Sequence, residues 1–148
     1  MAFEFSLAAV LRYRQSLEER ERVRLQSLHA RRAALLREVQ RAREARAHLQ
    51  TSVRQRLQGR LIPAVELQYL AASCDGLERR QQQLQAGLLQ LQVEITAQAR
   101  RYQEEHQKRE ALESLRDLRL GEYRLLQQRR EQAALDELFL LRRKVKQA

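Results

Sequence analysis

The sequence has little of what a compact globular domain needs in order to reverse its chain direction. It contains no Asn and no Trp, three Asp, four Gly and a single Pro in 148 residues. Turns depend on Gly, Pro, Asn and Asp, so a chain this poor in them has few places to turn. Aromatic residues make up only 5% of the chain. Together these shortages argue against a compact globule.

Long hydrophobic runs and paired cysteines are also absent, and we expect no signal peptide. No run of 18 apolar residues occurs, so we expect no transmembrane helix. The first eleven residues lack the basic stretch followed by an apolar stretch that marks a signal peptide. Cys74 is the only cysteine, which leaves no internal disulfide and favours a cytosolic setting.

What the chain does contain is abundant Ala, Leu, Glu, Arg and Gln, and a heptad pattern of apolar residues typical of coiled coils. In its second half, the positions at alternating steps of three and four are Leu67, Leu70, Cys74, Leu77, Gln81, Leu84, Leu88, Leu91 and Ile95. In its first half, they are Leu25, Leu28, Arg32, Leu35, Val39, Ala42, Arg46, Leu49, Val53 and Arg56. Each series predicts a long helix with one apolar seam.

Charged residues interrupt the first series in two ways. Before Leu25 the apolar residues fit the pattern poorly, and Glu18 and Glu21 would fall in the seam, so we expect the register to slip there. Arg32 and Arg46 also occupy seam positions. Their stems either snorkel or fix the register at a cost in stability, and the alternative is that they mark a docking site for another protein.

A glycine and a proline separate the two series. Gly59 suits a helix C-cap, and Pro63 suits the first turn of the helix that follows. We therefore predict an all-α fold, an antiparallel two-helix coiled-coil hairpin in which the second helix is longer. The whole chain, 1–148, would form a single coiled-coil domain.

The expected first helix covers about 6–58, with Ser6 as its N-cap, and the second covers about 63–146, with a turn at about 59–62. Folding the chain about this turn leaves the second helix overhanging after about 119. An apolar overhang would be exposed on a monomer, so we expect it to have a partner. Its large apolar residues are Leu125, Leu126, Leu135, Leu138, Phe139, Leu140 and Leu141.

The net charge of +10 is unevenly spread. Residues 1–58 carry 13 basic and 6 acidic side chains, residues 60–119 carry nine of each, and residues 120–148 carry seven and four. The excess positive charge could attract an acidic protein surface, nucleic acid or anionic lipid. Specific nucleic-acid binding is not expected, because no stacking aromatics interleave with the basic residues and no known module occurs.

The sequence offers no chemistry of the kind an enzyme needs. His29, His48 and His106 lie far apart, and none is spaced from another His or from Cys74 as in a zinc site. A His48–Cys74 contact across the hairpin is conceivable, but two ligands make a poor site. Phosphate-binding loops and hydrolase motifs are missing. We expect no catalytic residues, no cofactor and no metal.

Both ends of the chain resemble those of the FliJ family, the small coiled-coil proteins of the flagellar type III export apparatus. The start, Phe5-Ser-Leu-Ala-Ala-Val-Leu-Arg-Tyr-Arg followed by Glu18-Glu19-Arg20-Glu21, looks like the start of that family. The segment Arg130-Glu131-Gln132-Ala133-Ala134-Leu135-Asp136-Glu137-Leu138 is similar to its end, and Lys108-Arg109-Glu110-Ala111-Leu112-Glu113-Ser114-Leu115 also fits.

The resemblance implies a stalk-like protein that binds the hexameric ring of the export ATPase, contacts the cytoplasmic domain of the export gate and assists export chaperones. Such a protein would be a cytoplasmic monomer, peripherally associated with the inner face of the cell membrane at the flagellar base. The close alternative is the stalk protein of a virulence-type injectisome. A structural homodimeric coiled coil and an electrostatic nucleic-acid binder are alternatives of other classes.

The resemblance also points to two sets of partner-binding residues. Aligned on the Arg80-Gln-Gln-Gln-Leu84 step, the family's gate-contact positions match Tyr69, Ser73, Gly76 and Arg80. Their steps of four, three and four place them on one helix face, apart from the leucine seam. The second set, expected at the ATPase ring, lies in the overhang and comprises Leu135, Asp136, Glu137, Leu138 and Leu141.

Overall fold

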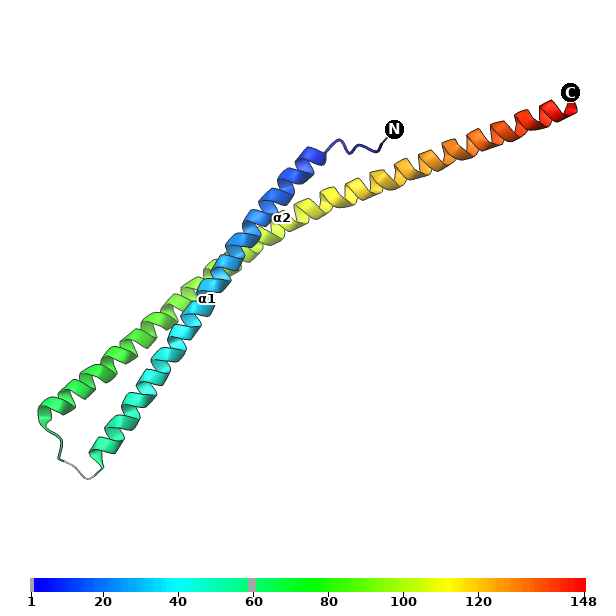
Figure 1. Ribbon diagram of the computed structural model, residues 1–148. Coiled ribbons are helices and arrows are strands. Elements are labelled where there is room, and N and C mark those ends of the chain that lie inside the picture. Colours follow the sequence, from blue (N-terminus) through cyan, green and yellow to red (C-terminus); the bar gives the residue numbers. More distant parts are fainter. Residues whose placement is uncertain (1, 59–60) are drawn as a thin grey trace. The chain divides into compact units, whose positions relative to one another are not determined.

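The computed structural model describes residues 2–58 and 61–148, and they form two α-helices (Figure 1). Helix α1 spans Ala8–Leu57 and helix α2 spans Ala64–Gln147. The described residues contain no strand. Two helices pack against each other and the second is longer, so the predicted all-α fold class is confirmed. The predicted single domain stays a prediction.

The helix starts differ slightly from the sequence-based expectation. Pro63 stands one position before α2, at the N-cap, where its carbonyl oxygen accepts hydrogen bonds from the amides of Glu66 and Leu67 at 3.0 and 3.2 Å. Helix α1 begins at Ala8, because the carbonyl of Leu7 accepts its first bond at 2.9 Å. Ser6 therefore precedes the N-cap position that we expected it to hold. The predicted cap Gly59 lies outside the described residues.

The chain divides into two compact units, and the unit of residues 20–102 contains the turn. Its segments run antiparallel: Glu38 of α1 pairs with Arg80 of α2 at 3.1 Å, and further along α1 Arg56 pairs with Glu66 at 2.5 Å. The centre of its core is a cluster of Val39, Ala42 and Leu84, with Leu35 and Leu88 packed against it. Leu70, Leu91 and Ile95 are also buried. Leu67, the expected first seam residue, is instead exposed.

The other unit comprises residues 1–19 and 103–148 and carries both termini. Its segments also run antiparallel, since Arg14 pairs with Glu105 at 3.6 Å while the earlier Ser6 accepts a hydrogen bond from the later Arg119 at 2.9 Å. Phe3 contacts Tyr123 with ring centroids 5.6 Å apart, a few residues beyond the predicted end of pairing.

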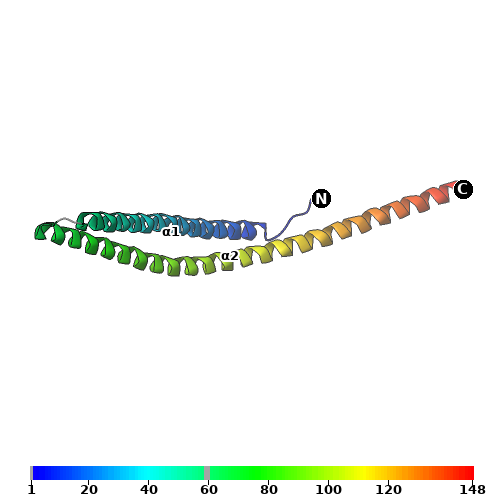
Figure 2. The same cartoon turned by 90° about the horizontal axis from the view of Figure 1, so that it is seen from below.

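Beyond this contact α2 continues without a neighbouring segment of its unit, as both views show at the red end of the helix (Figure 2). Every residue from 128 to 148 is exposed. We call residues 128–148 the overhang. Its helix has no tertiary packing within the described chain, so its apolar side chains face solvent.

The expected slip of register in α1 is wrong. The residues turned toward α2 before Leu25 are Leu11, Arg14, Glu18 and Glu21, at the same alternating steps of three and four. All of these are buried or half-buried. The seam therefore keeps its period and changes its chemistry, because charged side chains that find partners on α2 replace leucines.

Candidate partner-binding surfaces

The polar part of the seam is held by an ion-pair cluster in the unit that carries the termini. The carboxylate of Glu18, on α1, accepts a hydrogen bond from Nε of Arg109 and interacts with Nδ1 of His106 at 3.0 Å. Arg109 also pairs with Glu113 one turn along α2 at 2.5 Å. The side chain of Glu18 is only 13% exposed, so its partners on α2 are Arg109 and His106 with little room for water.

The surroundings of this cluster shift two pKa values. Burial alone would raise the pKa of Glu18, but hydrogen bonds and positive charge from His106 and Arg109 outweigh it and lower the pKa. Burial alone would lower the pKa of Arg109, but the carboxylates of Glu113 and Glu18 raise it. Both side chains therefore remain charged at neutral pH and attract each other across the two helices.

Of Arg32 and Arg46, the seam arginines for which a docking role was the alternative, only Arg46 is held within the hairpin. Arg46 is half-buried and donates a hydrogen bond to Gln81 Oε1 at 3.4 Å, so two polar seam residues satisfy each other. Arg32 is exposed and forms no hydrogen bond or ion pair with any described residue. Arg46 therefore fits the interpretation of a seam arginine that serves the hairpin itself. Arg32 is available to a partner.

The overhang carries the predicted ring-binding residues on an exposed apolar stripe. Leu135, Leu138 and Leu141 are 61%, 60% and 52% exposed. Leu135, Asp136 and Leu138 line one shallow hollow together with Phe139 and Arg142, which are not among the five predicted ring-binding residues. Leu141 and Glu137 do not line it. Asp136 accepts a hydrogen bond from Gln132 at 3.0 Å.

This stripe lies beside the continued seam of α2. After Tyr123 and Gln127, which are half-buried, alternating steps of three and four lead to Arg130, Ala134, Glu137 and Leu141, and Leu138 adjoins them. The overhang thus presents the kind of surface that packs against a helix elsewhere in the chain, with no helix of this chain upon it.

The predicted gate-contact residues lie early in α2, in the unit that contains the turn. Tyr69 is 72% exposed and Ser73 is half-buried. Gly76 is exposed, and a Cβ added there would meet no atom within 4 Å. Arg80 reaches across to Glu38, so its guanidinium is already engaged by α1.

A shallow hollow beside Arg80 adds α1 residues that sequence reasoning missed. Glu38 and Arg41 of α1 line it with Leu77 and Arg80 of α2. The antiparallel register would have placed α1 next to this part of α2, but the spacing of residues within α2 alone could not reveal it. Any partner of this face would therefore contact both helices.

The part of the chain that the structure describes offers neither a metal-binding cluster nor a membrane-spanning helix. There, no group of three or more His, Cys, Asp or Glu side chains could hold a metal ion. Among the described helices, none has a stretch both long and apolar enough to cross a membrane.

The fold and these surfaces define a coiled-coil hairpin protein whose longer helix ends in an unpaired apolar stripe. The chain belongs to the FliJ family, because the family model described as flagellar FliJ protein matches residues 3–147. It is thus a coiled-coil protein related to flagellar type III export. No curated protein and no solved structure matches the chain.

Proposed function

We propose that this chain is a non-enzymatic component of the flagellar export apparatus that acts by binding the hexameric export ATPase, the cytoplasmic domain of the export gate and export chaperones. The single observation that carries the proposal is the family match over residues 3–147. The description of that family as flagellar favours this role over a virulence-type injectisome. The chain would work in the cytoplasm, peripherally associated with the membrane at the flagellar base.

The overhang is the part of the chain that we assign to the ATPase ring. Its leucines are more than half exposed, and exposed apolar patches of this kind mark protein-binding surfaces. The C-terminal part of the chain that contains the overhang has a net positive charge, with seven basic and four acidic residues in 120–148. A ring lined by apolar and acidic side chains would complement it.

The experiment replaces Leu135, Leu138 and Leu141 with Ala together and measures both binding to the purified export ATPase and stimulation of its ATP hydrolysis. We expect binding to weaken by at least about tenfold, since each truncated anchor at an interface typically costs 1 kcal/mol or more. The matched control replaces Val65, Val93 and Leu118, which are also exposed and also on α2. If the triple leucine variant stimulates ATP hydrolysis as well as the unaltered chain, the overhang is not the contact with the ring.

The face of Tyr69, Ser73, Gly76 and Arg80 is the part that we assign to the export gate. Tyr69 is the obvious anchor, because exposed tyrosines supply a large rigid contact area and a polar hydroxyl. Replacing it with Ala should weaken binding to the gate's cytoplasmic domain and leave ATPase stimulation intact. Tyr13→Ala, which removes a 61% exposed tyrosine from α1, is the control. Equal losses in the two variants would speak against a specific site at Tyr69.

A further inference from the structure

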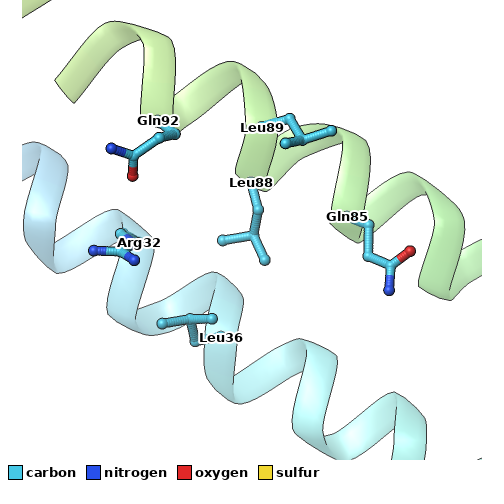
Figure 3. Close-up of a pocket in the computed structure, with 6 residues that line it drawn as sticks. All are labelled: Arg32, Leu36, Gln85, Leu88, Leu89 and Gln92. Carbon is cyan, nitrogen blue, oxygen red and sulfur yellow. The ribbon is translucent and has the colours of Figure 1, made fainter. Parts of the chain in front are cut away.

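A third hollow, distinct from the surfaces above, lies between α1 and α2 in the unit of residues 20–102. It encloses about 430 Å³ and is lined by Arg32 and Leu36 of α1 and by Gln85, Leu88, Leu89 and Gln92 of α2. Leu88 extends from α2 toward α1, and the two glutamines flank it along the helix (Figure 3). The hollow is thus an apolar notch with polar ends.

The floor of the notch is part of the hydrophobic core. Leu88 packs against the cluster of Val39, Ala42 and Leu84 while also lining the notch. Its walls are open, because Leu36 is 47% and Leu89 is 73% exposed. An apolar side chain entering here would extend an existing core rather than cover an isolated leucine, which increases the area removed from water.

The charge at the notch is unbalanced. Arg32 forms no ion pair with the described residues, and no carboxylate lines the notch. The other two hollows between these helices share no residue with the notch, and both contain carboxylates. In one of them Glu38 is paired with Arg80 at 3.1 Å. Of these three hollows, the notch is the one whose lining combines an arginine and apolar side chains with no carboxylate.

We propose that the notch binds a helix of another protein, one that inserts a leucine-sized side chain and places a carboxylate on Arg32 within one turn. A third helix fits the groove between two packed helices, with anchors spaced three or four residues apart. The arginine would recognise the carboxylate by charge-assisted hydrogen bonds. A two-fold contact that placed two notches face to face is disfavoured, because it would bring two Arg32 side chains together without a carboxylate.

The test is a selection from a displayed library of helical peptides, randomised at their surface positions, on the full-length chain. The enriched peptides should carry Leu with Glu or Asp at helical spacing. One such peptide, labelled with fluorescein, is then titrated by anisotropy against Arg32→Glu and Leu89→Ala. Each should weaken binding by about tenfold or more, the loss typical of a charge-assisted hydrogen bond or an apolar anchor.

Two matched controls make the test specific. Arg31→Glu changes the net charge equally at an exposed neighbour that lines a different hollow. Val93→Ala truncates an exposed residue one turn from Leu89. Both should bind the peptide within about twofold of the unaltered chain, as surface changes outside a contact usually do. Light scattering on the unaltered chain and Arg32→Glu should give the same mass.

The proposal is overturned if the library yields no binder that needs Arg32, or if the enriched peptides lack acidic residues. It also fails if Arg31→Glu weakens binding as much as Arg32→Glu, since attraction to net charge would then suffice. A mass that falls with Arg32→Glu would identify a second copy as the occupant instead. None of these results depends on the binding of the export ATPase or the gate.

Discussion

Glu18 is the residue whose surroundings say most about how the helices pair near the termini. It stands at a seam position of α1, almost covered, with Arg109 and His106 as its partners on α2. We expect this largely covered ion pair to fix which residues face each other more than to add net stability. Removing one partner leaves the other charged and poorly solvated, which is the costly case.

We therefore expect Glu18→Leu and Arg109→Leu each to destabilise the chain by about 1–3 kcal/mol, and the double variant to be more stable than either single one. Urea unfolding followed by circular dichroism measures all four proteins of this cycle. Glu131→Gln, in the exposed overhang, is the control and should change little. Additive losses in the double variant would contradict coupling between Glu18 and Arg109.

The lowered pKa of Glu18 predicts how stability depends on pH. Its ordinary value is 4.5, and the folded value lies below this because His106 and Arg109 overcome the effect of burial. Such a group contributes stability that is complete above the unfolded value and is lost as the pH falls through the folded value. The difference in melting temperature between the unaltered chain and Glu18→Gln should thus be largest near neutral pH and shrink in acid. Parallel curves across this range would contradict it.

The sequence predicted that Glu18 lies at a seam position, but not that its charge is paired there. The heptad spacing places Glu18 in the seam, where a charged residue suggested that the register slips. Its partners lie 88 and 91 residues away in the chain, so no local spacing could show that its carboxylate is paired with His106 and Arg109. Arg46 with Gln81 is a case of the same kind, since each looks like a defect until the other is placed opposite it.

At the scale of the element, the two helices were predictable because their information is local. Apolar periodicity and good helix formers specify α1 and α2, and the only proline specifies where α2 begins. The helix starts were less predictable. Ser6 is a favourable N-cap by type, yet its hydroxyl accepts a bond from Arg119, and α1 begins two residues later. The Ser6 hydroxyl thus makes a tertiary contact in place of the cap that its residue type predicted.

Glycine within α2 gives a second prediction at this scale. Gly121 is exposed in a continuous helix, and a Cβ added there would meet no atom within 4 Å. Gly121→Ala should stabilise the chain by about 0.5–1 kcal/mol, because alanine loses less backbone entropy in a helix. The midpoint of urea unfolding measures this. Gly121→Ser, a weaker helix former than alanine, should give a smaller gain. A loss with Ala would mean that the added methyl meets a neighbouring atom, and would contradict the open space around Gly121.

For the whole molecule, the distribution of packing matters more than the number of helices. The unit of residues 20–102 holds a buried cluster, the unit with the termini relies on charged pairs and a few apolar contacts, and the overhang has no packing of its own. The sequence predicted the overhang from the unequal lengths of the two series. It could not predict Arg32 as an unpaired charge beside an open notch, because that depends on which side chains surround it.

Amide hydrogen exchange tests this gradient directly. A helix without tertiary support is marginal in water, so residues 128–148 should exchange faster than any other helical segment of the chain. The amides around Val39 and Leu84, in the buried cluster, should exchange most slowly. If the overhang binds the export ATPase, adding the ATPase should slow exchange in 128–148 and leave the cluster near Leu84 unchanged. Slow exchange of the overhang in the chain alone would mean that its leucines are already covered, and the mass by light scattering would then show whether a second copy covers them.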